Sequence, residues 1–307
     1  MIQPPADALV SRRALDRILV IARAVPDLGD RIGFECRLGS AAGPVDLGLG
    51  IGRRTGGGEQ LPTLPPGFPP EWQRFAAFCR TWWDPTSLLH AWIPFAFLEF
   101  DADAPGTYPV PSVFVSLDWP LANPDDPRSE ADRRRLSATV VRNALALLLE
   151  SSADGRLAQN LDRCIDDLPD EGRVVHAGAM LGRSACGARL SIAVPRHAQG
   201  GYLAGLGLPQ LGDLIESIVA SLACEDGAVH LEVDVAEKIG PRVGVVLARD
   251  DTAGWARLLE RVADCGLCTA VEKAALLAWP QLSHVKVTPG TGGRLEAKAY
   301  LLLPSAA

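Results

Sequence analysis

Short segments that alternate polar and apolar residues recur along the chain, and they constrain the fold more than any other feature of the sequence. Because successive side chains of a strand point to opposite faces, each segment predicts a strand with one polar and one apolar face. The apolar face must be covered, so a fold that layers other elements against these strands is required. The residues predicted on the polar faces are Glu35, Arg37, Glu99, Asp101, Arg189, Ser191, Glu232, Asp234, His284, Lys286, Thr288, Glu296, Lys298 and Tyr300.

The predicted strands come in pairs, and helical periodicity fills the intervals between the pairs. We predict hairpins at 31–38 with 45–51, 96–102 with 111–118, 188–194 with 201–208, 229–235 with 242–248, and 284–288 with 294–303. Residues 174–181 also look extended, so the register of the third hairpin stays open. Amphipathic helices are predicted near 7–25, 72–83, 130–150, 156–168, 211–222 and 255–263, with a shorter one ending at Trp279.

This order of elements predicts an α+β protein whose apolar sheet faces are covered by the helices. About ten antiparallel strands strain an open sheet, and closing them into one barrel removes the exposed edges. A closed barrel of five hairpins, with helices outside and a polar lumen wide enough for ligands, is therefore one prediction. Two tandem α+β domains with open antiparallel sheets are the alternative.

The two halves of the chain resemble each other locally. Residues 98–101 (Leu-Glu-Phe-Asp) followed by 111–117 match residues 231–234 (Leu-Glu-Val-Asp) followed by 241–247. The match predicts a single domain over 1–307, built from an internal repeat of about 31–168 and 174–280 plus the final hairpin at 284–303.

Composition excludes several classes of protein. The 307 residues carry a net charge of −7 without a Lys/Arg-rich run, which argues against nucleic-acid binding and a polybasic membrane anchor. No apolar stretch approaches the length of a membrane span, and the first residues lack the pattern of a signal peptide. Seven scattered cysteines do not form a disulfide framework, so we expect a cytoplasmic protein.

The familiar short motifs of enzymes are incomplete. Cys265 and Cys268 have the spacing of a redox or zinc pair, but no second pair completes a site, and burial of free cysteines explains them better. Asp166, Asp167 and Asp170 spell the Asp-Asp-x-x-Asp of class I terpenoid enzymes, but the intervening proline breaks the helix that would align them. We therefore expect solvated loop acids and no metal site at either place.

Five hairpins with helices between them and a polar lumen resemble the barrel of the ABBA-type aromatic prenyltransferases. Lys298-Ala-Tyr300 is similar to the Lys-x-Tyr strand motif of the fungal indole prenyltransferases in that family. The resemblance implies transfer of an isoprenoid group from an allylic diphosphate to an aromatic or peptide natural-product acceptor inside the barrel. It implies no required cofactor, although the excess of acids on the polar faces leaves room for Mg²⁺ at the diphosphate.

The resemblance also implies roles for individual residues. Cations and tyrosines on neighbouring strands would hold the diphosphate, and a carboxylate, Glu99 or Glu232, would accept the proton of the acceptor. The candidate donor-binding residues are Lys298, Tyr300, Lys286, Arg37, Arg189 and His284. Two other interpretations stay open: a terpenoid cyclase that uses the acidic residues, and a non-catalytic binding or accessory protein whose charges pair across strands.

Overall fold

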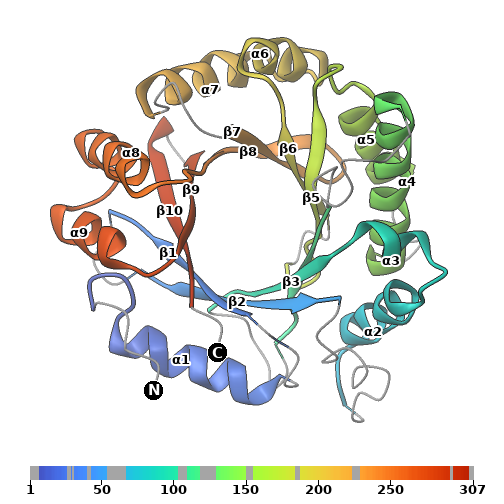
Figure 1. Cartoon of the computed structure of the whole chain (residues 1–307), viewed down its shortest axis with the longest axis horizontal. Helices are drawn as coiled ribbons and strands as arrows, with labels where there is room; N and C mark the ends of the chain where they lie inside the picture. Colours follow the sequence, from blue (N-terminus) through green and yellow to red (C-terminus); the bar gives the residue numbers. More distant parts are fainter. Residues whose placement is uncertain are drawn as a thin grey trace.

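Ten antiparallel strands close into one barrel, and the helices lie outside it (Figure 1). The computed structural model describes residues 7–25, 29, 31–39, 43–53, 67–102, 109–117, 129–149, 155–183, 187–222, 229–290 and 293–303. The strands are β1 (Arg31–Arg37), β2 (Val45–Gly52), β3 (Phe95–Phe100), β4 (Ser112–Ser116), β5 (Arg173–Ala179), β6 (Ala188–Ala193), β7 (Val229–Val235), β8 (Ile239–Leu247), β9 (Leu282–Pro289) and β10 (Leu295–Leu302).

Each strand pairs with its neighbours in sequence, and the first strand closes the barrel by pairing with the last. Glu35 of β1 lies opposite Tyr300 of β10, and Arg37 lies opposite Lys298. This pairing confirms the prediction of a closed barrel, and the alternative of two tandem domains with open sheets is wrong.

The helices form a ring around the barrel (Figure 1). They are α1 (Arg12–Ala24), α2 (Pro70–Trp83), α3 (Leu88–Trp92), α4 (Glu130–Leu149), α5 (Gly155–Asp166), α6 (Arg196–Gly205), α7 (Pro209–Leu222), α8 (Thr252–Asp264) and α9 (Ala270–Ala278). None of the helices in the described part of the chain is long and apolar enough to cross a membrane.

The third hairpin differs from its predicted form. Its strands are β5 and β6, whereas residues 201–208, predicted as a strand, lie largely in α6. The helix forms because Tyr202 and Leu203 pack inward together, and because Gln199 donates a hydrogen bond to the Val194 carbonyl. Gly200 and Gly201 in the middle of α6 weaken the helical pattern of the sequence, which is why the pattern predicts a strand here.

The apolar faces of the strands point outward to the helices and form the hydrophobic core. Leu98 and Phe100 of β3 are fully buried, and the Trp72 ring of α2 stacks on Phe100 with centroids 6.2 Å apart. Alternation then turns Phe97 and Glu99 of β3 toward the barrel interior. The polar faces predicted from the sequence therefore line the lumen.

Candidate functional site

Two lysines and a tyrosine from the final hairpin lie together on the lumen face. Lys286 of β9 and Lys298 of β10 are directly opposite each other in register. The Lys286 Nζ lies 3.4 Å from the Tyr300 hydroxyl, and the His284 ring stacks on Tyr300 with centroids 4.0 Å apart. Burial lowers the pKa of His284 to about 3, so this imidazole is neutral. The structure thus brings four predicted site residues into one cluster.

Lys298 is held by a carboxylate from the neighbouring strand. Its ammonium group donates a hydrogen bond to Glu35 of β1, whose side chain is only 4% exposed. Burial opposes ionisation of Glu35, but Lys298 and then Lys286 hold its pKa well below the usual value. Glu35 is therefore a buried anion whose ion-pair partner, among the described residues, is Lys298.

Glu232 of β7 holds two cations. It accepts a 2.5 Å hydrogen bond from Lys286 and lies 3.6 Å from the Arg189 Nε. Burial raises its pKa, but Lys286 and Arg189 outweigh burial and lower it to about 2. Arg189 of β6 also donates to Asp234 at 2.6 and 3.2 Å, so this part of the lumen is a continuous network of ion pairs.

Glu99 is bound by a residue that the sequence analysis missed. Arg183, in the turn after β5, donates to Glu99 at 2.8 Å and to Asp101 at 2.8 and 3.2 Å. Burial and the nearby Glu35 raise the pKa of Glu99 in spite of Arg183. Glu99 is therefore a weaker acid than Glu232. No periodic pattern could have identified Arg183, because it lies outside the strands.

A second missed residue, Asp46 of β2, lies directly opposite Glu35 in register. Its side chain is 2% exposed, and its Oδ1 accepts a 2.8 Å hydrogen bond from the Ala102 amide. It forms no ion pair with a described residue, and burial together with Glu35 raises its pKa to about 7. The alternation in Val-Asp-Leu-Gly-Leu-Gly-Ile-Gly is only a weak signal of its position, because Asp46 shares its parity with three glycines and with no other polar residue of the strand.

The other side of the lumen carries phenylalanine rings. Phe97 of β3 lies opposite Phe114 of β4, and its ring centroid is 4.5 Å from that of Phe95. Phe114 lies over Gly178 of β5, where an added Cβ would come within 2.4 Å of the ring. Gly178 thus leaves room for the Phe114 ring against the sheet. The lumen carries ion pairs along β6, β7, β9, β10 and β1, and phenylalanine rings along β3 and β4, where Glu99 also lies.

Arg37 lies at the end of β1 and is exposed. Register places it opposite Lys298, but it takes no part in the buried ion pairs. Three of the lumen carboxylates are poorly suited to Mg²⁺, because Glu35, Glu99 and Glu232 already hold lysine or arginine side chains. Within the described ranges, no group of three His, Cys, Asp or Glu residues is arranged to hold a metal ion.

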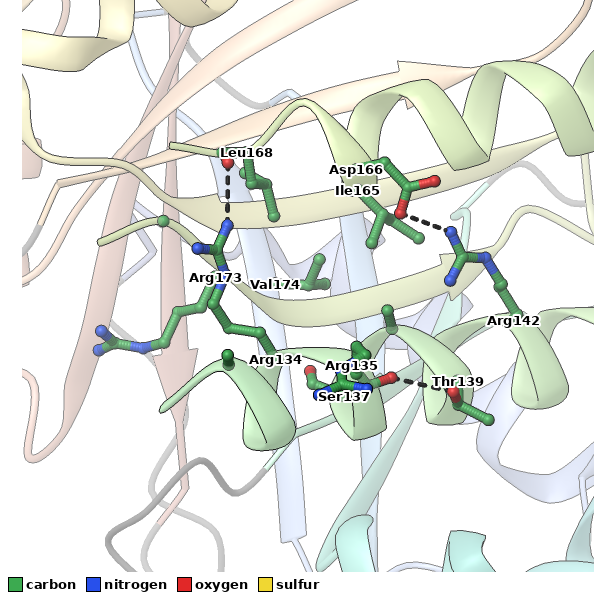
Figure 2. A pocket seen from close by; sticks show the side chains of 13 residues that line it. Arg134, Arg135, Ser137, Thr139, Arg142, Ile165, Asp166, Leu168, Arg173 and Val174 are labelled. Carbon is green, nitrogen blue, oxygen red and sulfur yellow. Dashed lines mark hydrogen bonds and ion pairs between the residues drawn. The ribbon is translucent and has the colours of Figure 1, made fainter. Parts of the chain in front are cut away.

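A cleft of about 400 Å³ lies outside the barrel, between α4, α5 and the start of β5 (Figure 2). Two of its arginines are engaged within the protein: Arg142 pairs with Asp162 and Asp166, and Arg134 donates to the carbonyls of Leu168 and Pro169. Asp166, from the predicted loop acids, therefore contributes to helix packing and not to the lumen. The lumen, and not this cleft, is the candidate active site.

The two cysteines singled out by their spacing do not form a site. Cys268 is buried and Cys265 is exposed, and both are free thiols. Burial raises the pKa of Cys268 to about 11, which disfavours the thiolate needed for redox or metal chemistry.

A closed ten-stranded antiparallel barrel with outer helices and a polar lumen is the architecture of the ABBA-type aromatic prenyltransferases, and comparison with solved structures bears this out. The chain is similar to the prenyltransferase PriB in its apo form, with a TM-score of 0.53 and 14% identity over 95% of this chain and 90% of that one.

It is also similar to AnaPT from Neosartorya fischeri, with a TM-score of 0.54 and 13% identity over 88% of this chain and 77% of that one. A third match is PriB in a ternary complex with L-tryptophan and dimethylallyl thiolodiphosphate, with a TM-score of 0.51 and 14% identity over 96% and 91% of the two chains. No family model matches the sequence, and no curated protein matches it. The likeness is thus one of fold.

Proposed function

We propose that the chain is a prenyltransferase that moves an isoprenoid group from an allylic diphosphate to an aromatic or peptide natural-product acceptor in the barrel lumen. The observation that carries this proposal is that Lys286 and Lys298 lie opposite each other on adjacent strands, beside Tyr300. The other side of the lumen carries an aromatic wall formed by Phe95, Phe97 and Phe114. The solved PriB complex with L-tryptophan and a thiolodiphosphate, which shares this fold, supports the same pair of ligand classes.

The lysine cluster is suited to the diphosphate end of the donor. Lys286, Lys298 and the Tyr300 hydroxyl offer charge-assisted and neutral hydrogen bonds from neighbouring strands. Arg189 reinforces the positive charge from β6, and neutral His284 holds the Tyr300 ring in place. Arg37 is available at the barrel end to guide the anionic donor inward.

The aromatic wall is suited to the isoprenoid group. Phe95, Phe97 and Phe114 present apolar faces that would exclude water from an allylic cation, and their negative π-faces would stabilise its charge. In the transfer step the bond between C1 of the donor and the diphosphate oxygen breaks, and both electrons leave with the diphosphate. The acceptor then forms its bond to C1 and loses a proton.

Glu99 is the better candidate for receiving that proton. Its pKa is raised, whereas the pKa of Glu232 is about 2, so Glu99 is the stronger base of the two. Glu232 would instead hold Lys286 and Arg189 in position. No step requires a metal ion, because the leaving diphosphate is neutralised by the protein's own cations.

One observation favours a non-catalytic binding or accessory role, as the sequence also allowed. Each lumen cation of the buried cluster already pairs with a carboxylate, as a structural ladder would require. No specific observation favours the terpenoid cyclase.

Binding and turnover with dimethylallyl, geranyl and farnesyl diphosphate test the proposal, first by calorimetry and then with tryptophan and other indoles as acceptors. Lys286→Ala and Lys298→Ala should lose donor binding while the circular dichroism spectrum is retained. Lys273→Ala is the matched control, because Lys273 pairs with Glu260 on the outer helices. A ladder role predicts no donor binding by the wild type, whereas loss of stability in the lumen variants is expected on either interpretation, because each lysine holds a buried carboxylate.

A further inference from the structure

We propose that Glu35 and Asp46 form a proton-accepting carboxyl pair, and that a proton on this pair replaces Lys298 when the lysine turns to the diphosphate. The inference rests on the proposed function, in which Lys298 binds the donor. It assigns to Asp46 the role of a positioning residue, which controls the availability of Lys298 without touching the substrate.

Glu35 depends mainly on Lys298 to balance its charge. Lys298 is its ion-pair partner in the described part of the chain, and the carboxylate is almost completely buried. A buried carboxylate that loses its ion-pair partner is strongly destabilised. When Lys298 leaves, only the hydrogen bond with Tyr300 and the charge of Lys286, which pairs with Glu232, still favour ionised Glu35, so a further source of neutralisation is needed. Lys286 is different, because Glu232 keeps Arg189 when Lys286 moves.

Asp46 lies where it can take up a proton beside Glu35. It lies opposite Glu35 in the β1–β2 ladder, and the hydrogen bond that its Oδ1 accepts from the Ala102 amide holds the carboxyl group in place. Two buried carboxyl groups in such a pair cannot both ionise without a neighbouring cation, so one of them takes a proton. A protonated carboxyl can also donate a hydrogen bond to the carboxylate beside it, which is what Glu35 needs when Lys298 departs.

The surrounding charges act in the same direction. Those that act on Asp46 come from three strands: Glu35 of β1, Glu99 of β3 and Lys298 of β10. The two acids favour protonation of Asp46, whereas the hydrogen bond from the Ala102 amide and the charge of Lys298 oppose it. Withdrawal of Lys298 therefore raises the pKa of Asp46 above its value of about 7 in the free protein. Asp101 is neutralised by Arg183, and the pKa of the Cys36 thiol is raised to about 12, so neither group supplies the proton.

This coupling predicts that donor binding takes up a proton from solution above neutral pH. Calorimetry with dimethylallyl thiolodiphosphate at pH 8, in buffers of different ionisation enthalpy, measures the uptake directly. At this pH the diphosphate is fully ionised and Asp46 is mostly deprotonated before binding, so the wild type should take up close to one proton. Its affinity should fall by up to about tenfold from pH 7.5 to 8.5.

Asp46→Asn keeps the shape of a protonated aspartic acid and its hydrogen-bond donor. It should abolish the uptake, remove the pH dependence and bind the donor more tightly than the wild type at pH 8.5. A merely structural role for Asp46 predicts weaker binding at every pH. The control Glu232→Gln should retain the uptake, because it leaves the Glu35–Asp46 pair intact.

A donor-free experiment separates this inference from the proposed function. In Lys298→Met, carboxyl-carbon NMR should show the Glu35–Asp46 pair holding its proton to higher pH than in the wild type. An unchanged titration of the pair would overturn the inference whether or not the donor binds, and so would donor binding without proton uptake. Failure of the donor to bind, with the titration shifted as expected, would instead reject the proposed function alone.

Discussion

Gly178 provides a direct test of how the aromatic wall is built. An added Cβ at this position would lie 2.4 Å from two ring atoms of Phe114 and 3.1 Å from a third, at the base of the ring. The inner edge of a ring cannot move without shifting the side chain, so Gly178→Ala should overpack the lumen at a cost of about 1–3 kcal/mol.

Gly48→Ala is the matched control, since Gly48 also faces the lumen from a strand. An added Cβ there would lie 3.6–3.9 Å from its nearest neighbours, all atoms of Gly33, which is ordinary contact. Both substitutions restrict the unfolded chain equally, a stabilising contribution of about 0.4–1 kcal/mol. The difference between the two variants therefore isolates the contact with Phe114.

Urea denaturation followed by tryptophan fluorescence measures both variants. We expect Gly178→Ala to unfold at a lower urea concentration than the wild type and Gly48→Ala at an equal or higher one. In a Phe114→Ala background, the penalty for Gly178→Ala should disappear. Equal midpoints for the two single variants, or an unchanged penalty in that background, would refute the idea that glycine seats the ring.

Three further substitutions test the charges. Asp46→Asn should raise the free energy of unfolding by roughly 2–4 kcal/mol at pH 8 but not at pH 4, because a raised pKa of about 7 makes the folded state lose stability as pH rises from about 4 to 7; equal gains at both pH values would contradict this. Lys298→Met should cost about 3–5 kcal/mol in urea denaturation, and adding Glu35→Gln should restore most of it, since no buried charge is then unpaired. Arg134→Met should cost about 1–3 kcal/mol in the same assay without affecting donor binding, because it removes bonds to the carbonyls after α5 and lies outside the barrel.

The barrel and its lumen-facing residues were predictable because the side-chain period of a strand is two. Once Glu232 and Lys286 were assigned to polar faces, closure of the sheet was enough to bring them into one lumen. Their pairing was not predictable, because it depends on register between strands far apart in the sequence. Arg183 was not predictable either, because it lies in a turn and only the tertiary structure brings it to Glu99 and Asp101.

Asp46 and α6 show two further limits. The strand around Asp46 alternates aliphatic residues with glycines, so a single acid did not establish a polar face. In α6, Gly200 and Gly201 weaken the helical pattern, and packing of Tyr202 and Leu203 outweighs this local preference. In both places one or two side chains decide how the element packs, and so few residues do not produce a recognisable period in the sequence.

The excess of acids over bases in the lumen, which argues against a diphosphate site when residues are only counted, has a different meaning once the pairs are known. Lys286 and Lys298 each pair with a buried carboxylate, which supplies the counter-ion that a buried ammonium group requires. Under the proposed function those carboxylates compete with the diphosphate, and each needs a second partner when its lysine departs. Glu232 also pairs with Arg189, and Asp46 lies opposite Glu35 in register, where we propose that it supplies a proton. The acid excess is therefore what a lumen needs if its cations are to exchange partners, and a structural ladder would need no such second partners.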